Sequence, residues 1–236
     1  MISKLFRWRR IQNTFRTIDD LDRERRLKKA DSVPLSLRKS TEILLIDDED
    51  IPLAKSLSTR GFRLVHWFDL ESIEAAKPYR IVLCDLNGVG LRLAPEMQGA
   101  GIIRELKRNY PDKVIVAYTG GGPSNITEQA YLDADYRLRK DATVDEWTDT
   151  LDTAIGQSAD PSMIWRKTRP RLLTAGITPL QLTLLEDDYV RSILNGDERS
   201  MTDLSSRVDL IDISADAKKI FIEVISAVAI KMITNS

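Results

Sequence analysis

The chain of 236 residues carries 35 Lys and Arg against 36 Asp and Glu, and its formal net charge of −1 gives no general attraction to nucleic acid or to an acidic surface. This length suits one or two domains with one sizeable core. The single cysteine, Cys84, excludes an intramolecular disulfide and fits a reducing compartment. We find no convincing signal peptide and no apolar run of about 18 residues, so a cytoplasmic location without a transmembrane segment is expected.

Charge is unevenly distributed and divides the chain into three segments. Residues 1–39 hold 12 basic and 5 acidic side chains, residues 40–157 hold 13 and 20, and residues 158–236 hold 10 and 11. The patterns within these segments predict a basic amphipathic helical extension, an α/β domain, and a helical interaction or dimerisation domain, in that order.

The N-terminal segment predicts a helix. Apolar residues recur at three- and four-residue spacings over residues 1–30, opposite a basic face, until Ser32-Val33-Pro34 ends the pattern. The basic face could bind a membrane surface or a polyanion. However, acidic residues such as Asp19, Asp20 and Glu24 dilute this face, so we favour a helix that docks on the rest of the chain or on a partner.

The middle segment alternates between apolar strand patterns and helical patterns. Strands are expected near residues 43–47, 62–67, 80–84, 113–118 and 135–139, and helices near 51–60, 70–76, 98–109, 124–132 and 144–156. This alternation predicts an α/β fold, a flavodoxin-like doubly wound parallel sheet of five strands with helices on both faces. Within it, Cys84 is expected to be a core residue and His66 a packed strand residue.

The C-terminal segment shows no strand pattern. Thr178-Pro179 predicts the start of a helix that ends at Gly196, and Ser214 can cap a final helix. That final helix is apolar around much of its circumference, with Ile220, Ile222, Val224, Ile225, Val228, Ile230 and Met232. Such a surface has to be buried, and the sequence therefore predicts a helical interface, either a symmetric homodimer or a contact with a helical protein partner.

Polar side chains follow the predicted strands at the point where each strand ends. Asp47 and Asp48 follow the first strand, Asp85 the third, Thr119 the fourth and Lys140 the fifth. In a flavodoxin-like strand order, the carboxyl ends of strands 1 and 3 lie side by side at the topological switch point. Three carboxylates there are unfavourable unless a cation neutralises them, and hard carboxylate oxygens suit Mg²⁺. The sequence thus predicts a magnesium site at which one carboxylate can carry a phosphoryl group, with a hydroxyl and an amine to bind its oxygens.

With these residues in this order, the segment 40–157 resembles the receiver domain of two-component response regulators. The resemblance implies that Asp85 is the phospho-acceptor, supported by Thr119 and Lys140, and that Mg²⁺ is bound by Asp47, Asp48, Asp85 and the main-chain carbonyl of Asn87. It also implies a histidine kinase or phosphotransfer protein as the phosphodonor, and a switch rather than an enzyme, capable at most of self-dephosphorylation.

The segment departs from the family pattern at three places. Asp141 replaces the usual proline after the lysine, and Arg137 occupies the aromatic switch position three residues before it. The loop after Asp85, which includes residues 87–97, is several residues longer than usual. These departures leave the phosphorylation chemistry intact, but the resemblance does not extend to the usual route from Asp85 to the output surface.

Other interpretations of the same residues remain open. Asp47 or Asp48 could cap the following helix, Thr119 could open a glycine-rich turn, and Lys140 could be a surface charge. Asp85-Leu86-Asn87 is also similar to the first motif of haloacid-dehalogenase-type phosphatases, although Asn87 replaces their second aspartate. A DNA-binding transcriptional regulator is the third alternative. It is not favoured, because residues 216–225 offer only Lys218 and Lys219 to DNA.

Overall fold

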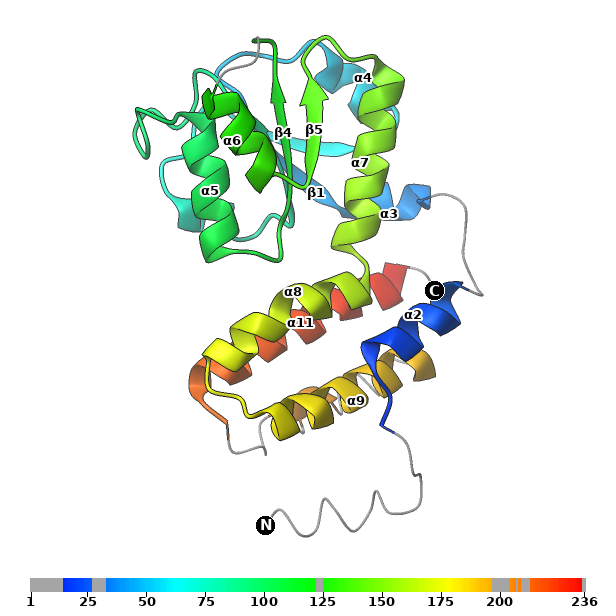
Figure 1. The fold of residues 1–236 in the computed structure, drawn as a ribbon. Coiled ribbons are helices and arrows are strands. Elements are labelled where there is room, and N and C mark those ends of the chain that lie inside the picture. Colours follow the sequence, from blue (N-terminus) through cyan, green and yellow to red (C-terminus); the bar gives the residue numbers. More distant parts are fainter. Residues whose placement is uncertain are drawn as a thin grey trace. The chain divides into compact units, whose positions relative to one another are not determined.

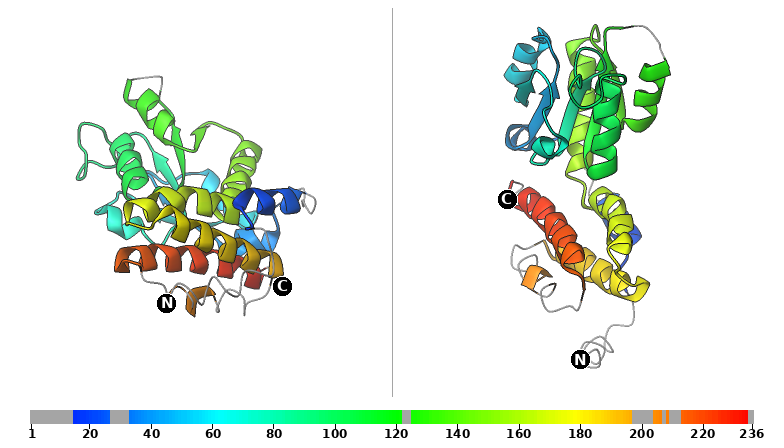
Figure 2. Two further views of the ribbon diagram at one scale, coloured as in Figure 1. Left: turned by 60° about the horizontal axis from the view of Figure 1, so that its bottom comes forward. Right: turned by 90° about the vertical axis from the view of Figure 1, so that its left-hand side faces the viewer.

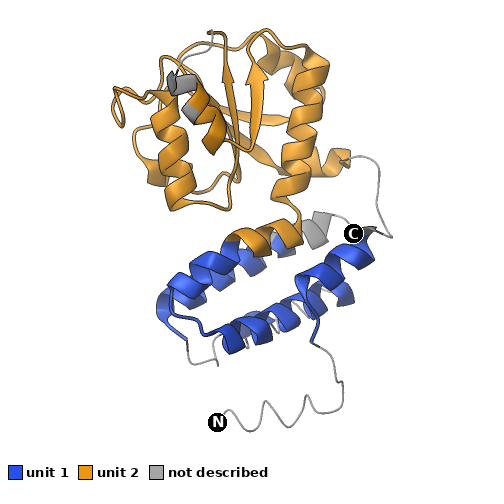
Figure 3. Cartoon of the chain, in the orientation of Figure 1, with its two compact units in different colours: residues 1–29, 168–233 blue, residues 30–167, 234–236 orange. Residues whose placement is uncertain are grey.

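The computed structural model of the chain describes residues 15–26, 33–121, 125–196, 204–206, 208 and 213–234. These residues form two compact units (Figure 3). Unit 1 takes its described residues from 1–29 and 168–233, and unit 2 takes them from 30–167 and 234–236. Residues 15–26 of the N-terminal segment therefore group with the C-terminal helices, whereas residues 33–39 belong to unit 2. The division into three functional domains stays a prediction.

A five-stranded parallel sheet lies at the centre of unit 2, in the order β2-β1-β3-β4-β5, which confirms the predicted flavodoxin-like fold (Figure 1). Its strands in chain order are β1 (Glu42–Ile46), β2 (Arg63–Trp67), β3 (Ile81–Asp85), β4 (Val114–Thr119) and β5 (Tyr136–Arg139). All four strand pairs are parallel, and Ile46 pairs with Cys84 across β1 and β3. The carboxyl ends of all five strands therefore lie at one edge of the sheet.

Alternate residues of the inner strands face two separate layers of helices. The side chains of Leu45 and Leu83 join one core cluster, while those of Leu44 and Val82 join the other. On the first face lie α3 (Leu35–Ser40), α4 (Leu53–Thr59) and α7 (Val144–Ser158), and on the second lie η2 (Ile73–Ala76), α5 (Gly99–Asn109) and α6 (Asn125–Asp133). Because both faces are covered, the inner strands are apolar throughout rather than alternating with polar residues.

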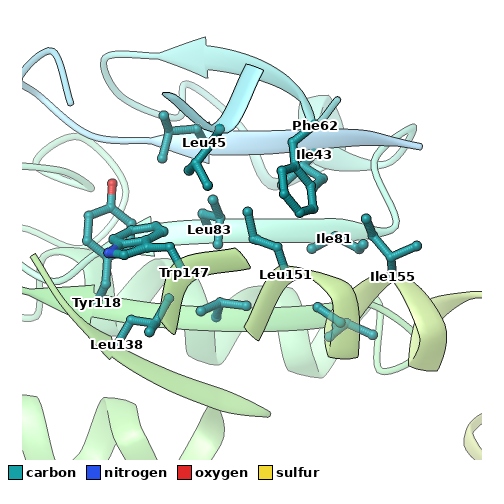
Figure 4. Packing of buried hydrophobic residues seen from close by; sticks show 14 of the residues in the cluster. Ile43, Leu45, Phe62, Ile81, Leu83, Tyr118, Leu138, Trp147, Leu151 and Ile155 are labelled. Carbon is teal, nitrogen blue, oxygen red and sulfur yellow. The ribbon is translucent and has the colours of Figure 1, made fainter. Parts of the chain in front are cut away.

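The packing of α7 on β1, β3 and β4 shows how this core is held together (Figure 4). Leu45, Leu83 and Leu151 have at most 1% of their surface exposed, and Trp147 is equally buried. Each such side chain contributes about 1.5–3 kcal/mol through removal of apolar surface from water. Thr143 begins α7 with a capping box closed by Glu146, which fixes where the helix starts on the sheet.

The helix predicted near residues 70–76 is instead a single 3₁₀ turn. Ser72 caps it by accepting a hydrogen bond from the amide of Ala75, and Pro78 follows only one residue after its C-cap. A proline has no amide hydrogen and clashes with a preceding helical turn, so the element cannot extend. The other predicted helices and strands of unit 2 lie within about two residues of their expected bounds, which is the usual uncertainty of element boundaries.

Unit 1 is helical, and α9 and α11 run alongside each other in it (Figure 2). Its helices are α2 (Ile18–Arg26), the later part of α8 (Pro161–Thr174), α9 (Pro179–Asn195) and α11 (Ala215–Thr234). Thr178 opens α9 with a capping box, and Gly196 ends it at φ +71°, as predicted. Helix α8 was not predicted, and it contains Pro170, a residue that opposes a helix. The predicted helical residues 1–14 lie outside the described part of the chain.

Much of the described apolar surface of α11 is buried within the chain. Val224, Ile225 and Val228 are buried, whereas Ile222 remains 37% exposed. The side chains of Ile230 and Met232 lie outside the described part of the structure. The apolar excess that favoured a dimer is thus largely accounted for within one chain. No helix among the described residues is long and apolar enough to cross a membrane.

Candidate functional site

Three predicted acidic residues meet at the carboxyl edge of the sheet. Asp47 directly follows β1 and Asp85 is the last residue of β3, so the pairing of β1 with β3 places them side by side. One carboxylate oxygen from each of Asp47, Asp48 and Asp85 lies within 4.8 Å of the others. Asp47 is fully buried, Asp85 is 2% exposed, and Asp48 faces solvent. The predicted acidic cluster (Asp47, Asp48 and Asp85) is therefore formed, with one side open.

Lys140 lies against this cluster from the end of β5. Its Nζ is 2.6 Å from Asp85 Oδ2 and 3.2 Å from Asp47 Oδ2, while the nearest oxygen of Glu49 is 3.9 Å away. Burial alone would lower the pKa of Lys140, but the hydrogen bonds and charges of Asp85 and Asp47 raise it above its ordinary value. One ammonium group thus faces three carboxylates, and the remaining negative charge favours a divalent cation.

Asp85 is held at both carboxylate oxygens. Oδ1 accepts hydrogen bonds from the amides of Leu86, at 2.7 Å, and Asn87, at 3.3 Å, while Oδ2 faces Lys140. Burial raises the pKa of Asp85, the hydrogen bond and charge of Lys140 oppose this, and the charge of Asp47 adds to it. The carboxylate is fixed in position, and its ionised form depends on Lys140 or on a bound cation.

Asp47 is surrounded by donors, two of which the sequence did not reveal. Its carboxylate accepts from the Glu49 amide at 2.9 Å, from Lys140, and from the Tyr118 hydroxyl at 2.7 Å. Its main-chain carbonyl accepts from Nε2 of His66 at 2.8 Å. His66 is thus part of the wall of the site rather than only a packed strand residue. Tyr118 lies at the end of the apolar run of β4, where the sequence pattern does not mark its hydroxyl as part of the site.

Thr119 and Asn87 contact each other beside the cluster. The Asn87 side-chain amide donates to Thr119 Oγ1 at 2.7 Å, and the amide of Gly121 donates to the same oxygen at 3.0 Å. Thr119 is 4% exposed, and the main-chain amide of Asn87 donates to Asp85 Oδ1 at 3.3 Å. The hydroxyl of Thr119 is therefore connected to the acidic cluster through Asn87. The roles of both residues stay predictions.

The long loop after Asp85 is pinned on both sides. Asp69 Oδ1 accepts from the amide of Gly90 at 2.5 Å, and Gln98 Oε1 accepts from the amide of Gly88 at 3.0 Å. Gln98 has a φ of +50°, the only positive φ of a non-glycine among the described residues. Such a conformation costs about 1–3 kcal/mol and persists only where the surroundings enforce it. The loop beside the site is thus held in place by specific hydrogen bonds.

The two other departures from the family pattern lie on the outer side of β5. Arg137 donates through Nε to the carbonyl of Tyr131 at 3.1 Å, and its guanidinium lies 5.3 Å from the Tyr131 ring centre. Asp141 forms a two-pronged pair with Arg139, with both distances 2.7 Å. With Leu138, Ala142 and Glu146, these residues line a hollow of about 540 Å³.

No protein-family model matches the chain, and no curated protein matches its sequence. Solved structures that resemble this chain are receiver domains of response regulators. The NtrX receiver domain from Brucella abortus is 26% identical over 48% of this chain and 98% of that chain, with a TM-score of 0.41. The Vibrio cholerae chemotaxis protein CheY4 is 17% identical over 48% and 98%, with a TM-score of 0.40. A longer NtrX structure, in complex with ATP, is matched over 35% of its length at 22% identity, with a TM-score of 0.43.

The donor set of the acidic cluster fits a hard divalent cation. Carboxylate oxygens are the ligands that Mg²⁺ prefers, and the exposed side of Asp48 leaves room for the several waters that Mg²⁺ retains. Asp47, Asp48 and Asp85 could therefore hold the ion. No histidine or cysteine joins them among the described residues.

Proposed function

We propose that unit 2 is a phospho-accepting receiver and that the chain is a response-regulator-type signalling protein. Asp85 accepts the phosphoryl group, Thr119 and Lys140 bind its oxygens, and Asp47, Asp48, Asp85 and the main-chain carbonyl of Asn87 hold Mg²⁺. The observation that supports this most strongly is the gathering of three carboxylates and Lys140 at the switch point of the sheet, with Lys140 Nζ 2.6 Å from Asp85 Oδ2.

The proposed transfer is a simple displacement at phosphorus. A carboxylate oxygen of Asp85 forms a bond to phosphorus while the bond from phosphorus to a histidine nitrogen of the donor breaks, and the imidazole keeps the electron pair and takes up a proton. Lys140 offsets negative charge as it develops on the phosphoryl oxygens. Bound Mg²⁺ supplies further neutralisation of the same charge.

The phosphodonor has to come from another molecule. His66 is the only histidine of the chain, and its Nε2 donates to the carbonyl of Asp47. A histidine kinase or phosphotransfer protein is therefore the proposed partner. Output is proposed to pass through helical protein contacts of unit 1, and a symmetric dimer is one form of such a contact. Light scattering on the full chain, with and without a phosphoryl mimic, tests that form.

Turnover as a phosphatase is less well supported. Haloacid-dehalogenase-type chemistry needs a second acid two residues after the nucleophile, and here Asn87 uses its amide to bond Thr119. An amide cannot exchange a proton with a leaving group. We therefore infer a switch, with loss of phosphate from Asp85 as the only catalytic property. Steady release of phosphate from small phosphomonoesters would contradict this inference.

The test is intact-mass spectrometry of the full chain after treatment with acetyl phosphate. With Mg²⁺ the wild-type protein should gain about 80 Da, the mass of one PO₃H unit, and without Mg²⁺ it should not. Asp85→Asn should abolish the adduct, because the amide is not a nucleophile towards phosphorus. Asp50→Asn is the matched control, since Asp50 lies in the same acidic loop but is 93% exposed and outside the cluster. An adduct that persists in Asp85→Asn rules out this acceptor.

A further inference from the structure

Tyr118 connects β4 to the acidic cluster across the intervening strand β3. It is the residue before Thr119 in β4, and its hydroxyl reaches past β3 to Asp47 Oδ2 at 2.7 Å and to the Ile46 carbonyl at 3.3 Å. A hydroxyl has one proton, and the shorter contact to the charged oxygen is the stronger hydrogen bond. Burial and the negative charge of Asp47 raise the pKa of Tyr118, so the phenol stays a donor.

The ring of Tyr118 packs against Trp147 at the start of α7. The two ring centres are 5.2 Å apart with an interplanar angle of 67°, an edge-to-face contact visible in Figure 4. Trp147 is 1% exposed, and its indole N–H has no acceptor among the described residues. Packing alone therefore sets the position of the indole, and Tyr118 is part of that packing.

The family's usual switch position cannot serve this purpose here. Arg137 occupies it and turns outward, where its guanidinium contacts Tyr131. A switch at this position would have to bring the side chain inward in one state, and burial of an arginine without a charged partner is strongly unfavourable. A signal from Asp85 to the helices thus needs another path.

We propose that Tyr118 and Trp147 carry the state of the acidic cluster to α7. The proposal rests on the proposed function. Asp47 accepts from both Tyr118 and Lys140, and Lys140 also contacts Asp85. A phosphoryl group on Asp85 draws Lys140 towards its oxygens and away from Asp47. The Asp47 carboxylate then loses part of its ion pair, and this changes the hydrogen bond that it accepts from Tyr118. The ring then moves against Trp147, and α7 repacks between two arrangements. Tyr118 acts through Asp47 and is a positioning residue.

Fluorine NMR of the full chain labelled with 5-fluorotryptophan tests this path, with the Trp147 resonance assigned from Trp147→Phe. Addition of Mg²⁺ and beryllium fluoride, a phosphoryl mimic, should shift the Trp147 resonance by more than its linewidth. Tyr118→Phe keeps the ring and removes the hydroxyl, so it should lose most of that shift when compared with the wild type at Mg²⁺ and beryllium fluoride concentrations that saturate each protein. Tyr136→Phe is the matched control, because this hydroxyl also bonds α7, to Gln157 at 2.6 Å, but does not contact the cluster. It should leave the Trp147 shift unchanged.

Two results overturn the path: a Trp147 resonance that stays in place although the adduct forms, or a full shift in Tyr118→Phe. Hydrogen exchange of α7 gives a second measurement that does not depend on the Tyr118 variant. Loading should change exchange at the start of α7 in the wild type and not in Trp147→Phe, and an equal change in both also overturns the path. Absence of any adduct in the wild type would instead refute the proposed function. The effect of Mg²⁺ alone on the Trp147 resonance then decides whether Trp147 responds to the cluster.

Discussion

Gly88 allows the Asp48 carboxylate to lie close to the backbone of the loop that follows Asp85. A Cβ atom at this position would be 2.2 Å from Asp48 Oδ2, and the residue has a φ of +76°. Both the space and the left-handed conformation therefore require glycine. The solvent-facing ligand of the proposed metal site depends on a residue that carries no side chain of its own.

Gly88→Ala should weaken Mg²⁺ binding. The added methyl group displaces the Asp48 carboxylate, and a tenfold loss of affinity corresponds to about 1.4 kcal/mol. Gly176→Ala is the matched control, because Gly176 also has a left-handed φ, +89°, but its Cβ would meet nothing within 4 Å. Both variants should lose about 1 kcal/mol of stability from the strained backbone. In calorimetric titrations only Gly88→Ala should bind Mg²⁺ more weakly, and equal affinities in the two variants would place the metal elsewhere.

Tyr118 should make the stability of unit 2 sensitive to alkaline pH. Burial, the hydrogen bond to Asp47 and the charge of Asp47 raise its pKa in the folded protein above the ordinary value of 10.0. The folded state therefore keeps the phenol proton to higher pH than the unfolded state. The stabilising contribution is complete below about pH 10, and it falls by about 1.4 kcal/mol per pH unit above that, until the folded pKa is reached.

The measurement is the unfolding free energy of wild type minus that of Tyr118→Phe, followed by urea denaturation from pH 8 to pH 11. This difference should be constant up to about pH 10 and should then decrease. A difference that stays constant up to pH 11 would mean that Tyr118 does not hold its proton in the way its contacts require. Other titrating groups are common to both proteins and cancel.

At the residue scale, the sequence predicted the charged members of the site but not their neighbours. Asp47, Asp85 and Lys140 each stand where a strand ends, and parallel strands bring such positions to one edge. Tyr118 lies inside an apolar strand that is buried on both faces. Hydrophobic periodicity there does not predict which side chains its hydroxyl contacts. Only the three-dimensional pairing of β1, β3 and β4 brings that hydroxyl to Asp47.

Helix α3 shows how an element outside the sheet ties the first face together. Arg38 donates through Nε to Asp152 Oδ1 at 2.6 Å, and a second pair of atoms joins the same two side chains. The guanidinium also donates to the carbonyl of Arg60 at 3.2 Å and lies 4.9 Å from the Phe62 ring centre. The side chains of Arg38 and Asp152 are 20% and 21% exposed, so this pair is largely shielded from water.

Arg38→Met should destabilise unit 2 by about 1.5–3 kcal/mol, the range for a hydrogen bond to a charged group whose partner is left unpaired. Arg63→Met is the matched control, because the Arg63–Glu42 pair joins β2 to β1 but is 54% and 47% exposed. An exposed pair contributes about 0–1 kcal/mol. Chemical denaturation of both variants measures the difference. Equal losses would show that α3 does not hold α7 through this contact.

The ends of an element were predictable where a capping residue determines them locally. Thr178 and Gly196 define both ends of α9, because a capping box and a left-handed C-cap are local signals. Helix α8 escaped prediction because Pro170 within it opposes a helix, and tertiary packing outweighs that local cost. The short η2 was predicted to begin about three residues too early, because Leu70 continues the apolar spacing whereas Ser72 caps the turn and starts it at Ile73.

At the scale of the whole molecule, the N-terminal helix was expected to dock on the chain or a partner, and the described part docks within unit 1. The amide of Ile18 donates to Glu186 at 2.9 Å, and the amide of Arg16 donates to Asp187 at 2.8 Å. Glu186 and Asp187 are 8% and 2% exposed, so they bond the first amide of α2 and an amide just before the helix in place of water. The partners are separated by about 170 residues, and no local pattern in the sequence could have paired them.

The two units should respond differently to magnesium, since the acidic cluster lies wholly in unit 2. A ligand stabilises only the structure that binds it, by RT ln(1 + [L]/Kd), which is about 1.4 kcal/mol at a concentration ten times Kd. Calorimetric unfolding of the full chain should therefore show a Mg²⁺-dependent rise for the transition of unit 2 and none for the transition of unit 1. The two can be assigned by hydrogen exchange, with β3 reporting on unit 2 and α9 on unit 1.

Asp48→Ala should remove the Mg²⁺-dependent rise without lowering the metal-free transition, because loss of an exposed carboxylate also relieves repulsion within the cluster. A rise of equal size in both transitions would mean that the ion binds outside the acidic cluster, or that the two units unfold as one.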